Sequence, residues 1–246
     1  MTLFYAYLPT FVVTALLLMA ERWRSAPPTD WWRNLEAWGL QVIIALTIQP
    51  LLAIWEGPGL INTASLPFWA GFILFLLIKD LGEYLFHRAQ HRIPALWAMH
   101  SLHHSDPEMA VLTTQRHFWG EQLIKQLTIW SATLMLITPT SDIIVAYGLF
   151  ALVNLVTHCD LPINLGRWSW VINSPAYHRR HHSRLPEHYD SNFAAIFPIF
   201  DVLCGSYHRP EGFPPTGLAR KPENIGELLV WPLIWDKAPT GDVAQA

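Results

Sequence analysis

Five apolar stretches, separated by short polar segments, dominate the pattern of this 246-residue chain. They run approximately over Leu3–Ala20, Ala37–Trp55, Leu66–Phe86, Glu121–Ile137 and Ile143–His158. Each is long enough to cross, or nearly cross, a hydrocarbon core of about 30 Å. The last two are shorter and more polar, so either can be a buried hairpin arm that enters a membrane without crossing it. The pattern predicts an all-α, integral membrane helical bundle with about four to five membrane helices.

Charges between these stretches predict the orientation of the bundle. Basic residues gather in the segment 21–34 and in the segment after the third stretch, which carries Arg88, Arg92 and Arg116. The connections 56–65 and 138–142 carry no Lys or Arg. Because basic residues favour the cytoplasmic side, the N-terminus is expected outside and the C-terminus inside. The short turn at 138–142 predicts that the last two stretches form an antiparallel hairpin.

Composition supports a membrane setting. Charged residues form 14% of the chain, against roughly 25% in an ordinary soluble domain. The 13 tryptophans suit membrane interfaces, and a formal charge of -3 is too small to indicate a nucleic-acid partner. We expect three parts: N-terminal membrane helices over 1–65, a histidine-rich domain over 66–208, and a Pro-rich tail over 209–246 that lies in the membrane interface or packs on the domain.

Eight of the twelve histidines fall into three groups. In the first, at the end of the third stretch, one helical stripe carries Asp80, Tyr84, His87 and His91. Two imidazoles four residues apart can bind one metal ion. A carboxylate deeper in the membrane is costly without a partner, so we expect Asp80 to accept the ring N–H of a ligand histidine.

The other two groups are the triplets His100-x-x-His103-His104 and His178-x-x-His181-His182. Residues three or four apart are neighbours on a helix, whereas adjacent residues diverge by about 100°. Each triplet can therefore bind one metal ion with two residues and offer the third to a second ion. Neutral imidazole suits zinc, iron, copper and nickel. Eight histidines exceed what one ion can use, so two adjacent ions are predicted.

A simpler interpretation exists for each histidine taken alone. A lone histidine is ordinarily a packing or surface residue, and a triplet beside Arg179 and Arg180 can be a solvated basic surface. Three groups in order on one membrane face favour metal binding instead. We expect His117 to support a ligand or the fold, and His188 and His208 to lie at the surface or in packing contacts.

The order H-x-x-x-H, H-x-x-H-H, H-x-x-H-H resembles the fatty acid hydroxylase and sterol desaturase superfamily. The resemblance extends from about Phe68 to Tyr207 and includes Trp97 and the blocks 192–193 and 200–206. It implies a membrane bundle with a histidine-rich helical cap on its cytoplasmic face, which makes 66–208 the catalytic domain. Proteins of this family bind two iron ions there, and they oxidise lipids with O2 and electrons supplied from outside.

Carried over by position, the resemblance implies the ligands His87, His91, His100, His103, His104, His158, His178, His181 and His182. Some relatives have a further histidine four residues before His158, where this chain has Asn154. An amide oxygen or a water can fill that gap. Residues expected to support the ligands are Asp80, Tyr84, Asn154 and Arg116.

These observations predict a membrane-bound di-iron oxygenase that hydroxylates or desaturates a C–H bond of a fatty acyl chain, sterol or other isoprenoid. The expected cofactors are two iron ions, which zinc can replace in preparations. No nucleotide or flavin motif is present, so we expect a separate electron donor: a cytochrome b5-like protein, a ferredoxin or a reductase. The other expected partners are O2, membrane lipids and the lipid substrate, whose path the apolar faces of the third to fifth helices line.

The expected location is a bacterial inner membrane, with the active site facing the cytoplasm. Two alternatives have other chemistry. One is a membrane metal-binding or transport protein without redox chemistry, although transport sites usually lie near the bilayer midplane. The other is a haem protein, which needs only one or two of these histidines.

Overall fold

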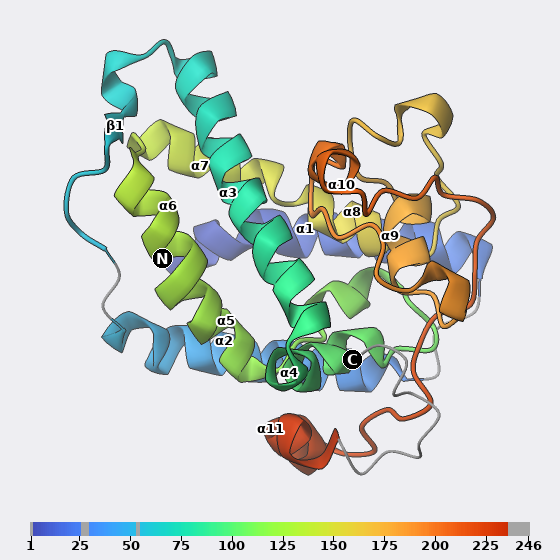
Figure 1. The fold of residues 1–246 in the computed structure, drawn as a ribbon. Helices are drawn as coiled ribbons and strands as arrows, with labels where there is room; N and C mark the ends of the chain where they lie inside the picture. Colours follow the sequence, from blue (N-terminus) through green and yellow to red (C-terminus); the bar gives the residue numbers. More distant parts are fainter. Residues whose placement is uncertain (1, 26–29, 53–54, 236–246) are drawn as a thin grey trace.

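The computed structural model describes residues 2–25, 30–52 and 55–235, with side chains from Leu8 onward. The end of the predicted tail, 236–246, and short pieces of the predicted N-terminal region lie outside these residues. Figure 1 shows a mostly helical molecule, which confirms the predicted fold class in its general form.

The N-terminal region forms two helices. Helix α1 spans Thr2–Arg24, and α2 spans Trp31–Thr47 and is followed by the short η1, Gln49–Leu51. Leucine side chains of both helices, together with tryptophans of α2, pack on a buried cluster that includes Val111, Leu112 and Leu155. The two helices are thereby attached to the histidine-rich part of the chain.

Helix α3, Phe68–Arg92, is the longest of the described helices and crosses α1 and α2 steeply (Figure 1). It ends because Ile93 precedes a proline, and a residue before proline disfavours helical geometry. Pro94 then takes the first position of α4, Pro94–His104, where its missing N–H costs nothing. This proline places the ends of α3 and α4, and therefore two of the histidine groups, side by side.

The fourth predicted stretch forms α5, Trp119–Lys125, a π-helical segment, Gln126–Trp130, and α6, Ser131–Leu136. The fifth forms α7, Ser141–Phe150, and α8, Val153–His158, with a break between them. Before α7, β2 (Ile137–Thr138) pairs in parallel with β1 (Ile61–Asn62). Strand β1 is followed by the short helix η2 (Thr63–Ser65). Two-residue strands are too short for a sequence period to reveal, so this pairing was not predicted.

The rest of the chain alternates short helices with long loops. These helices are η3 (Val111–Gln115), η5 (Gly166–Trp168), α9 (Pro175–His181), η6 (Pro186–His188), α10 (Ile199–Cys204) and α11 (Ile225–Ile234). Helix α11 lies against α4, where the buried Trp231 donates its indole N–H to Ser101 Oγ at 2.9 Å. The described part of the tail is therefore packed on the domain by a specific contact.

Among the described helices, the stretch Ser141–His158 alone is long and apolar enough to qualify as a membrane span. The predicted four to five spans are therefore supported only in part. Helix α3 carries three charged residues, Lys79, Asp80 and Glu83, in its middle. Helix α1 is described with side chains only from Leu8, so residues 3–7 of the first predicted span lie outside the described side chains.

One side of α3 is nevertheless an exposed apolar ridge. Ile73, Leu77, Leu81 and Leu85 follow each other at four-residue intervals and are 50%, 38%, 39% and 55% exposed. Large apolar side chains are also exposed on α1, α2 and α7. Contiguous exposed apolar surface of this kind marks a membrane or protein contact in a folded chain.

Candidate metal centre

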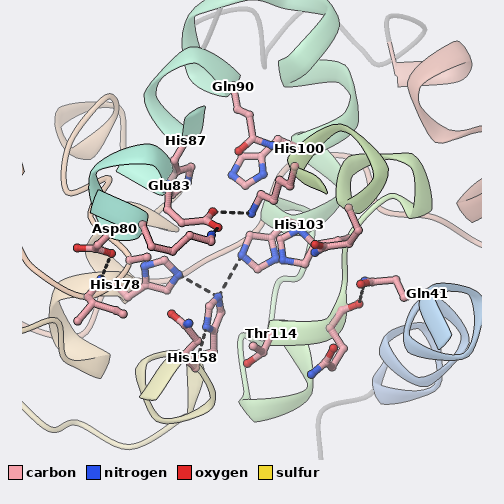
Figure 2. A pocket seen from close by; sticks show the side chains of 18 of the residues that line it. Gln41, Asp80, Glu83, His87, Gln90, His100, His103, Thr114, His158 and His178 are labelled. Atoms are coloured by element: carbon pink, nitrogen blue, oxygen red, sulfur yellow. Dashed lines mark hydrogen bonds and ion pairs between the residues drawn. The ribbon is translucent and has the colours of Figure 1, made fainter. Parts of the chain in front are cut away.

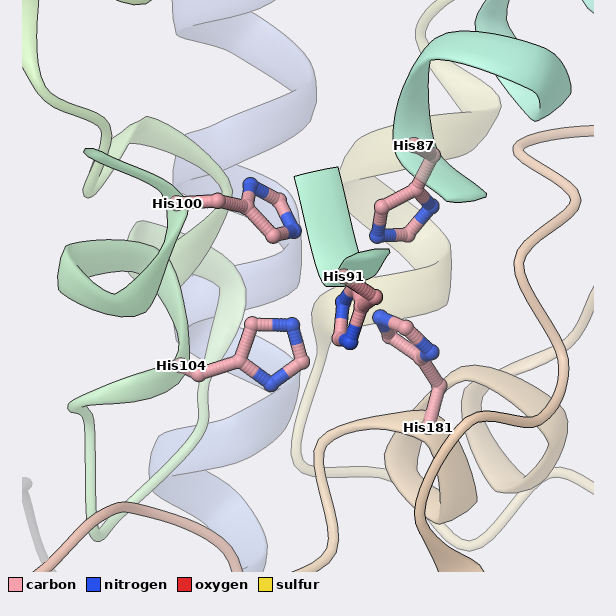
Figure 3. Close-up of side chains that lie close together, drawn as sticks. All are labelled: His87, His91, His100, His104 and His181. Atoms are coloured by element: carbon pink, nitrogen blue, oxygen red, sulfur yellow. The ribbon is translucent and has the colours of Figure 1, made fainter. Parts of the chain in front are cut away.

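All nine histidines predicted as ligands lie in two clusters. The first contains His87, His91, His100, His104 and His181, which point toward one another in Figure 3. The second contains His103, His158, His178 and His182. Within each cluster the candidate ligand atoms lie within 4.8 Å of one another. Helices α3, α4, α8 and α9 therefore bring together in one cluster residues as far apart in the chain as His87 and His181.

Each histidine triplet is divided between the clusters as helical geometry requires. In α4, His100 and His104 belong to the first cluster and His103 belongs to the second. At α9 the pair four residues apart, His178 and the C-capping His182, belongs to the second cluster and His181 to the first. The grouping agrees with the spacing argument, because adjacent residues on a helix diverge by about 100°.

Distances in the second cluster match ligands of one cation. The Nε2 atom of His158 lies 3.0 Å from that of His103 and 2.9 Å from that of His178, which in turn lies 3.2 Å from that of His182. Metal–imidazole bonds of roughly 2.0–2.1 Å place two ligand nitrogens at right angles about 2.9 Å apart. Four ring nitrogens that converge at this spacing fit a shared ion.

Ring nitrogens of the first cluster are free to bind a metal. The Nδ1 atom of His87 lies 2.7 Å from the carbonyl oxygen of Phe193, and that of His181 lies 2.8 Å from the carbonyl of Ser191. A ring N–H donated to a carbonyl leaves Nε2 as an acceptor. The buried Nε2 atoms of both residues, and those of His91 and His104, have no hydrogen-bond partner among the described residues. Buried polar atoms are rarely left unpaired, so the cluster fits a bound ion.

Burial also favours the ligand form of the histidines. It lowers the pKa of His91, His104 and His182 well below the usual value, and neighbouring imidazoles lower these pKa values further. The same two causes lower the pKa of His103 and His181. Neutral imidazole is the form that binds metals, so the protein holds these rings ready for ligation.

The two clusters are immediate neighbours. The rings of His104, from the first, and His182, from the second, stack with centroids 4.3 Å apart. His103 and His104 are sequence neighbours whose rings are 5.9 Å apart and nearly perpendicular. The clusters can therefore hold two adjacent ions.

Asp80 does not contact a histidine, so the predicted carboxylate–imidazole bond is wrong. Its two carboxylate oxygens accept the main-chain N–H groups of Ile196 and Phe197 at 3.0 and 2.8 Å. The Nδ1 atoms of His87 and His181 instead face main-chain carbonyls of the same loop, residues 191–197 (below, the carbonyl loop). Asp80 therefore supports the ligands indirectly, because it holds this loop against α3.

A second carboxylate holds the other end of the carbonyl loop. Buried Asp201 accepts the main-chain N–H groups of Phe193 and Ala194 at 2.9 and 2.8 Å, together with the hydroxyl groups of Tyr177 and Ser206. Asn192, in the same loop, has a φ of +61°, a left-handed conformation that asparagine tolerates better than most residues. The loop conformation that presents the carbonyls is therefore set by polar residues away from the histidines.

Tyr84 also acts through this region. Its hydroxyl lies 3.0 Å from Ser206 Oγ and accepts a hydrogen bond from Arg88 at 3.0 Å. Its ring packs against Phe193 and Phe200. Tyr84 thus contacts both the carbonyl loop and the segment that contains Asp201, and it does not bind a histidine.

Asn154 and Arg116 have different surroundings. The main-chain oxygen of Asn154 lies 2.7 Å from His158 Nδ1, and its side-chain amide donates to the carbonyl of Ala151. Arg116 is fully buried and donates to Ser105 Oγ and Asn34 Oδ1 at 3.1 and 3.0 Å. Arg116 therefore joins the end of α4 to α2 and has no contact with the clusters.

His117 and Glu121 form a smaller group beside the first cluster. A carboxylate oxygen of Glu121 lies 3.2 Å from His117 Nδ1 and 3.6 Å from His100 Nδ1. The ring of His117 stacks on His103 with centroids 4.1 Å apart. His188 and His208 lie outside all of these groups.

A cavity of about 300 Å³ borders both clusters, with His87, His100, His103, His158 and His178 in its lining. Figure 2 shows these rings beside polar and charged side chains. This cavity is polar, because its other lining residues include Lys79, Asp80, Glu83, Gln90 and Lys125. The apolar substrate path along the third to fifth helices stays a prediction. Sequence reasoning did not single out Lys79, Glu83, Gln90 or Lys125, although charges inside an apolar helix are themselves a signal of a functional site.

The chain matches the fatty acid hydroxylase family over residues 72–206, more than half of its length. It is 31% identical over 160 residues to an alkylglycerol monooxygenase of Xenopus tropicalis, covering 65% of this chain and 35% of that protein. It is 30% identical over 139 residues to an ornithine lipid hydroxylase of Rhizobium tropici, covering 56% and 42%. A human alkylglycerol monooxygenase is 28% identical over 211 residues, covering 81% and 46%.

This protein belongs to the fatty acid hydroxylase family. The match covers less than half the length of each of these curated relatives. No solved structure matches the chain significantly. The family region contains all nine histidines of the two clusters, which are the eight of the three sequence motifs and His158.

Proposed function

We propose that this member of the fatty acid hydroxylase family is a membrane-bound di-iron oxygenase that hydroxylates, or desaturates, a C–H bond of a lipid. The observation that supports the proposal most directly is the pair of adjacent, buried clusters of neutral imidazoles. One ion would be held by the first cluster and the other by the second. Two bound iron ions supply O2 activation and the oxidising power needed to attack an unactivated carbon.

The residues of the chain perform the tasks that surround this chemistry. Phe193 and Ser191 carbonyls keep the Nε2 lone pairs of His87 and His181 directed inward. The carboxylate of Glu121 lies 3.6 Å from His100 Nδ1, which is near enough for electrostatic attraction but too far for a hydrogen bond. Burial of every cluster residue except the half-buried His87 excludes bulk water from the reacting position. Iron is proposed over zinc because the relatives are named as a hydroxylase and monooxygenases.

The lipid substrate is proposed from the same names and from the surface. The relatives are named for an ether lipid and an amino-acid lipid, and the exposed ridge on α3 fits a hydrocarbon surrounding. We extend the proposal to a multi-pass arrangement in a bacterial inner membrane, with residues 1–65 as membrane helices and 66–208 as the catalytic domain facing the cytoplasm. Electrons would come from a separate donor protein. Family membership favours this function over the transport and haem alternatives.

The test is oxygen consumption by purified protein loaded with iron in lipid nanodiscs. With a chemical reductant and a mixture of ether, acyl and amino-acid lipids, we expect O2 uptake together with a lipid product 16 mass units heavier for hydroxylation or 2 lighter for desaturation. Zinc-loaded protein and the His103→Ala variant are the controls and should be inactive. Protein with two bound iron ions per chain that consumed no O2 with any of these lipids would refute the proposal.

A further inference from the structure

A second cavity, of about 470 Å³, lies between α1, α2 and the start of η3 (below, the α1–α2 cavity). One stripe of α1, from Phe11 to Arg22, and one stripe of α2, from Trp31 to Trp38, form its long walls. It shares no lining residue with the cavity beside the histidine clusters. A molecule bound in it therefore does not touch the candidate metal ligands, and it is not the substrate.

The α1–α2 cavity has the form of an apolar slot. Phe11, Thr14, Leu18 and Arg22 recur at intervals of three or four residues, so they face the same side of α1. Eleven residues of helix extend over about 16 Å. Phe11 and Ala15 are exposed as well as lining, so the slot is open along α1. A slot of this length and volume fits one hydrocarbon chain.

Arg22 is the only charged residue in this lining. Its Nη1 atom is buried and has no hydrogen-bond partner among the described residues. The neighbouring Glu21 attracts Arg22 electrostatically, but Glu21 Oε1 accepts the main-chain N–H groups of Val111 and Asp160 at 2.8 and 2.7 Å. The guanidinium group thus keeps a buried N–H donor for which the described residues supply no acceptor.

Thr14 provides a second donor inside the slot. It is 4% exposed, and its hydroxyl has no hydrogen-bond partner among the described residues. The hydroxyls of Thr128 and Thr133 instead donate to the carbonyl four residues earlier, at 2.6 and 2.7 Å. Both ends of the Asn34 amide are already bonded. Because buried polar atoms are rarely left unpaired, the two free donors indicate a ligand that brings acceptor oxygens.

We propose that the α1–α2 cavity binds one acyl chain of an anionic membrane phospholipid. Its phosphate accepts from Arg22, and an ester oxygen accepts from Thr14. The second acyl chain stays in the bilayer, because the slot has room for one. In the proposed membrane arrangement Arg22 lies at the cytoplasmic surface, where anionic lipids attract basic residues. The inference rests on that arrangement, and it adds to the proposed function a lipid that is bound but not oxidised.

The bound chain would join the N-terminal helices to the metal centre. Leu112 lines the slot and packs in one buried cluster with Leu155 and Cys159. The ligand His158 lies on the same helix as Leu155, at its end. A lipid that binds only the folded chain raises its stability. At about a hundred times the Kd, Tm should rise by roughly 5–10 °C.

Zinc-loaded protein in a neutral detergent tests the site, because it carries out no redox chemistry. Native mass spectrometry would compare phosphatidylglycerol, phosphatidylcholine and a free fatty acid, all with the same acyl chain. We expect one phosphatidylglycerol per chain, bound roughly tenfold or more tightly than the other two, since the phosphate forms charge-assisted hydrogen bonds without a cationic head group beside it. Equal binding of the two phospholipids, tighter binding of the fatty acid, or no bound lipid would overturn the proposal.

Variants test the two parts of the slot. Arg22→Met should weaken phosphatidylglycerol binding roughly tenfold or more and keep both metal ions. Arg24→Met, exposed on the same helix and outside the lining, is the control of equal charge and should bind normally. Ala15→Phe fills the slot from an exposed position and should prevent binding. Equal effects of the two arginine variants, or unchanged binding by Ala15→Phe, would contradict the assignment.

The lipid site and the proposed oxygenase can fail separately. Selective binding of phosphatidylglycerol by the zinc-loaded protein, without O2 consumption by the iron-loaded protein, would leave the site intact and refute the oxygenase. O2 consumption by a protein that binds all three lipids equally would support the oxygenase and refute the site.

Discussion

The carboxylate of Asp201 offers a sharp test of how the first cluster is held. It is fully buried and accepts two main-chain N–H groups and two hydroxyl groups. Asp201→Asn keeps the size of the side chain and replaces one oxygen by an NH2 group. The hydroxyl of Tyr177 or Ser206 can rotate and accept from that group, whereas a main-chain N–H cannot. The substitution therefore leaves one buried N–H unpaired.

An unpaired buried N–H costs about 1–3 kcal/mol, and the remaining bonds weaken because they lose a charged acceptor. We expect a loss of about 2–4 kcal/mol in the free energy of unfolding, which corresponds to a fall in Tm of roughly 4–16 °C for a chain of this size. Because the carbonyl loop orients His87 and His181, the affinity of the first cluster for its ion should fall by roughly 10- to 100-fold.

The second cluster provides the internal control. The orienting contact of His158 comes from Asn154 on its own helix, α8, and does not involve the carbonyl loop. Metal analysis after dialysis should therefore find close to one ion per chain in Asp201→Asn and two in the unmodified protein. The exposed Asp142→Asn should retain both ions. Loss of both ions in equal measure, with the fold intact by circular dichroism, would refute this division of the site.

Two further predictions use the histidines themselves. His103→Ala should remove the ion of the second cluster and His181→Ala that of the first, and each variant should lose turnover. His188→Ala should keep both ions and normal activity. Equal metal contents in all three variants would undermine the assignments. Burial lowers the pKa of His104 and His182 in the folded state, so below about pH 6.5 the unfolded chain binds more protons than the folded one. The metal-free protein should therefore be most stable above pH 7 and lose stability as the pH falls through about 6.5. A denaturation midpoint that stayed constant from pH 8 to 5.5 would contradict this reasoning.

Local pattern was sufficient for the parts of the fold and site that depend on spacing along a helix. The apolar stretches indicated most of the helices, and the intervals between histidines anticipated how each triplet is divided. Breaks inside a stretch were not visible, because the π-helical segment Gln126–Trp130 and the break between α7 and α8 contain no proline or glycine that marks them. These features depend on packing against other helices, which a single stretch of sequence does not encode.

The orienting partners of the histidines could not be predicted for a different reason. A main-chain carbonyl has no sequence signature, so the contacts from Phe193 and Ser191 were invisible until the carbonyl loop was placed. What the sequence does contain are the side chains that shape that loop. Asp80 was recognised as a polar residue near the site, but its partners are main-chain N–H groups and not imidazoles. Its carboxylate therefore acts one step further from the metal than expected.

Helix α3, which the proposed multi-pass arrangement places in the membrane, shows why such a helix with a functional site would be hard to recognise by composition. Its exposed ridge, including Leu77 and Leu81, is apolar, while Lys79 and Glu83 lie on the opposite side and line the cavity. The charged residues that make α3 too polar to qualify as an apolar membrane span are therefore the same residues that line the cavity beside the histidine clusters. Because charged groups in a membrane are stable only when paired or hydrated, the Lys79–Glu83 pair and its link to Lys125 would allow α3 to face hydrocarbon on one side and a polar site on the other in the proposed arrangement.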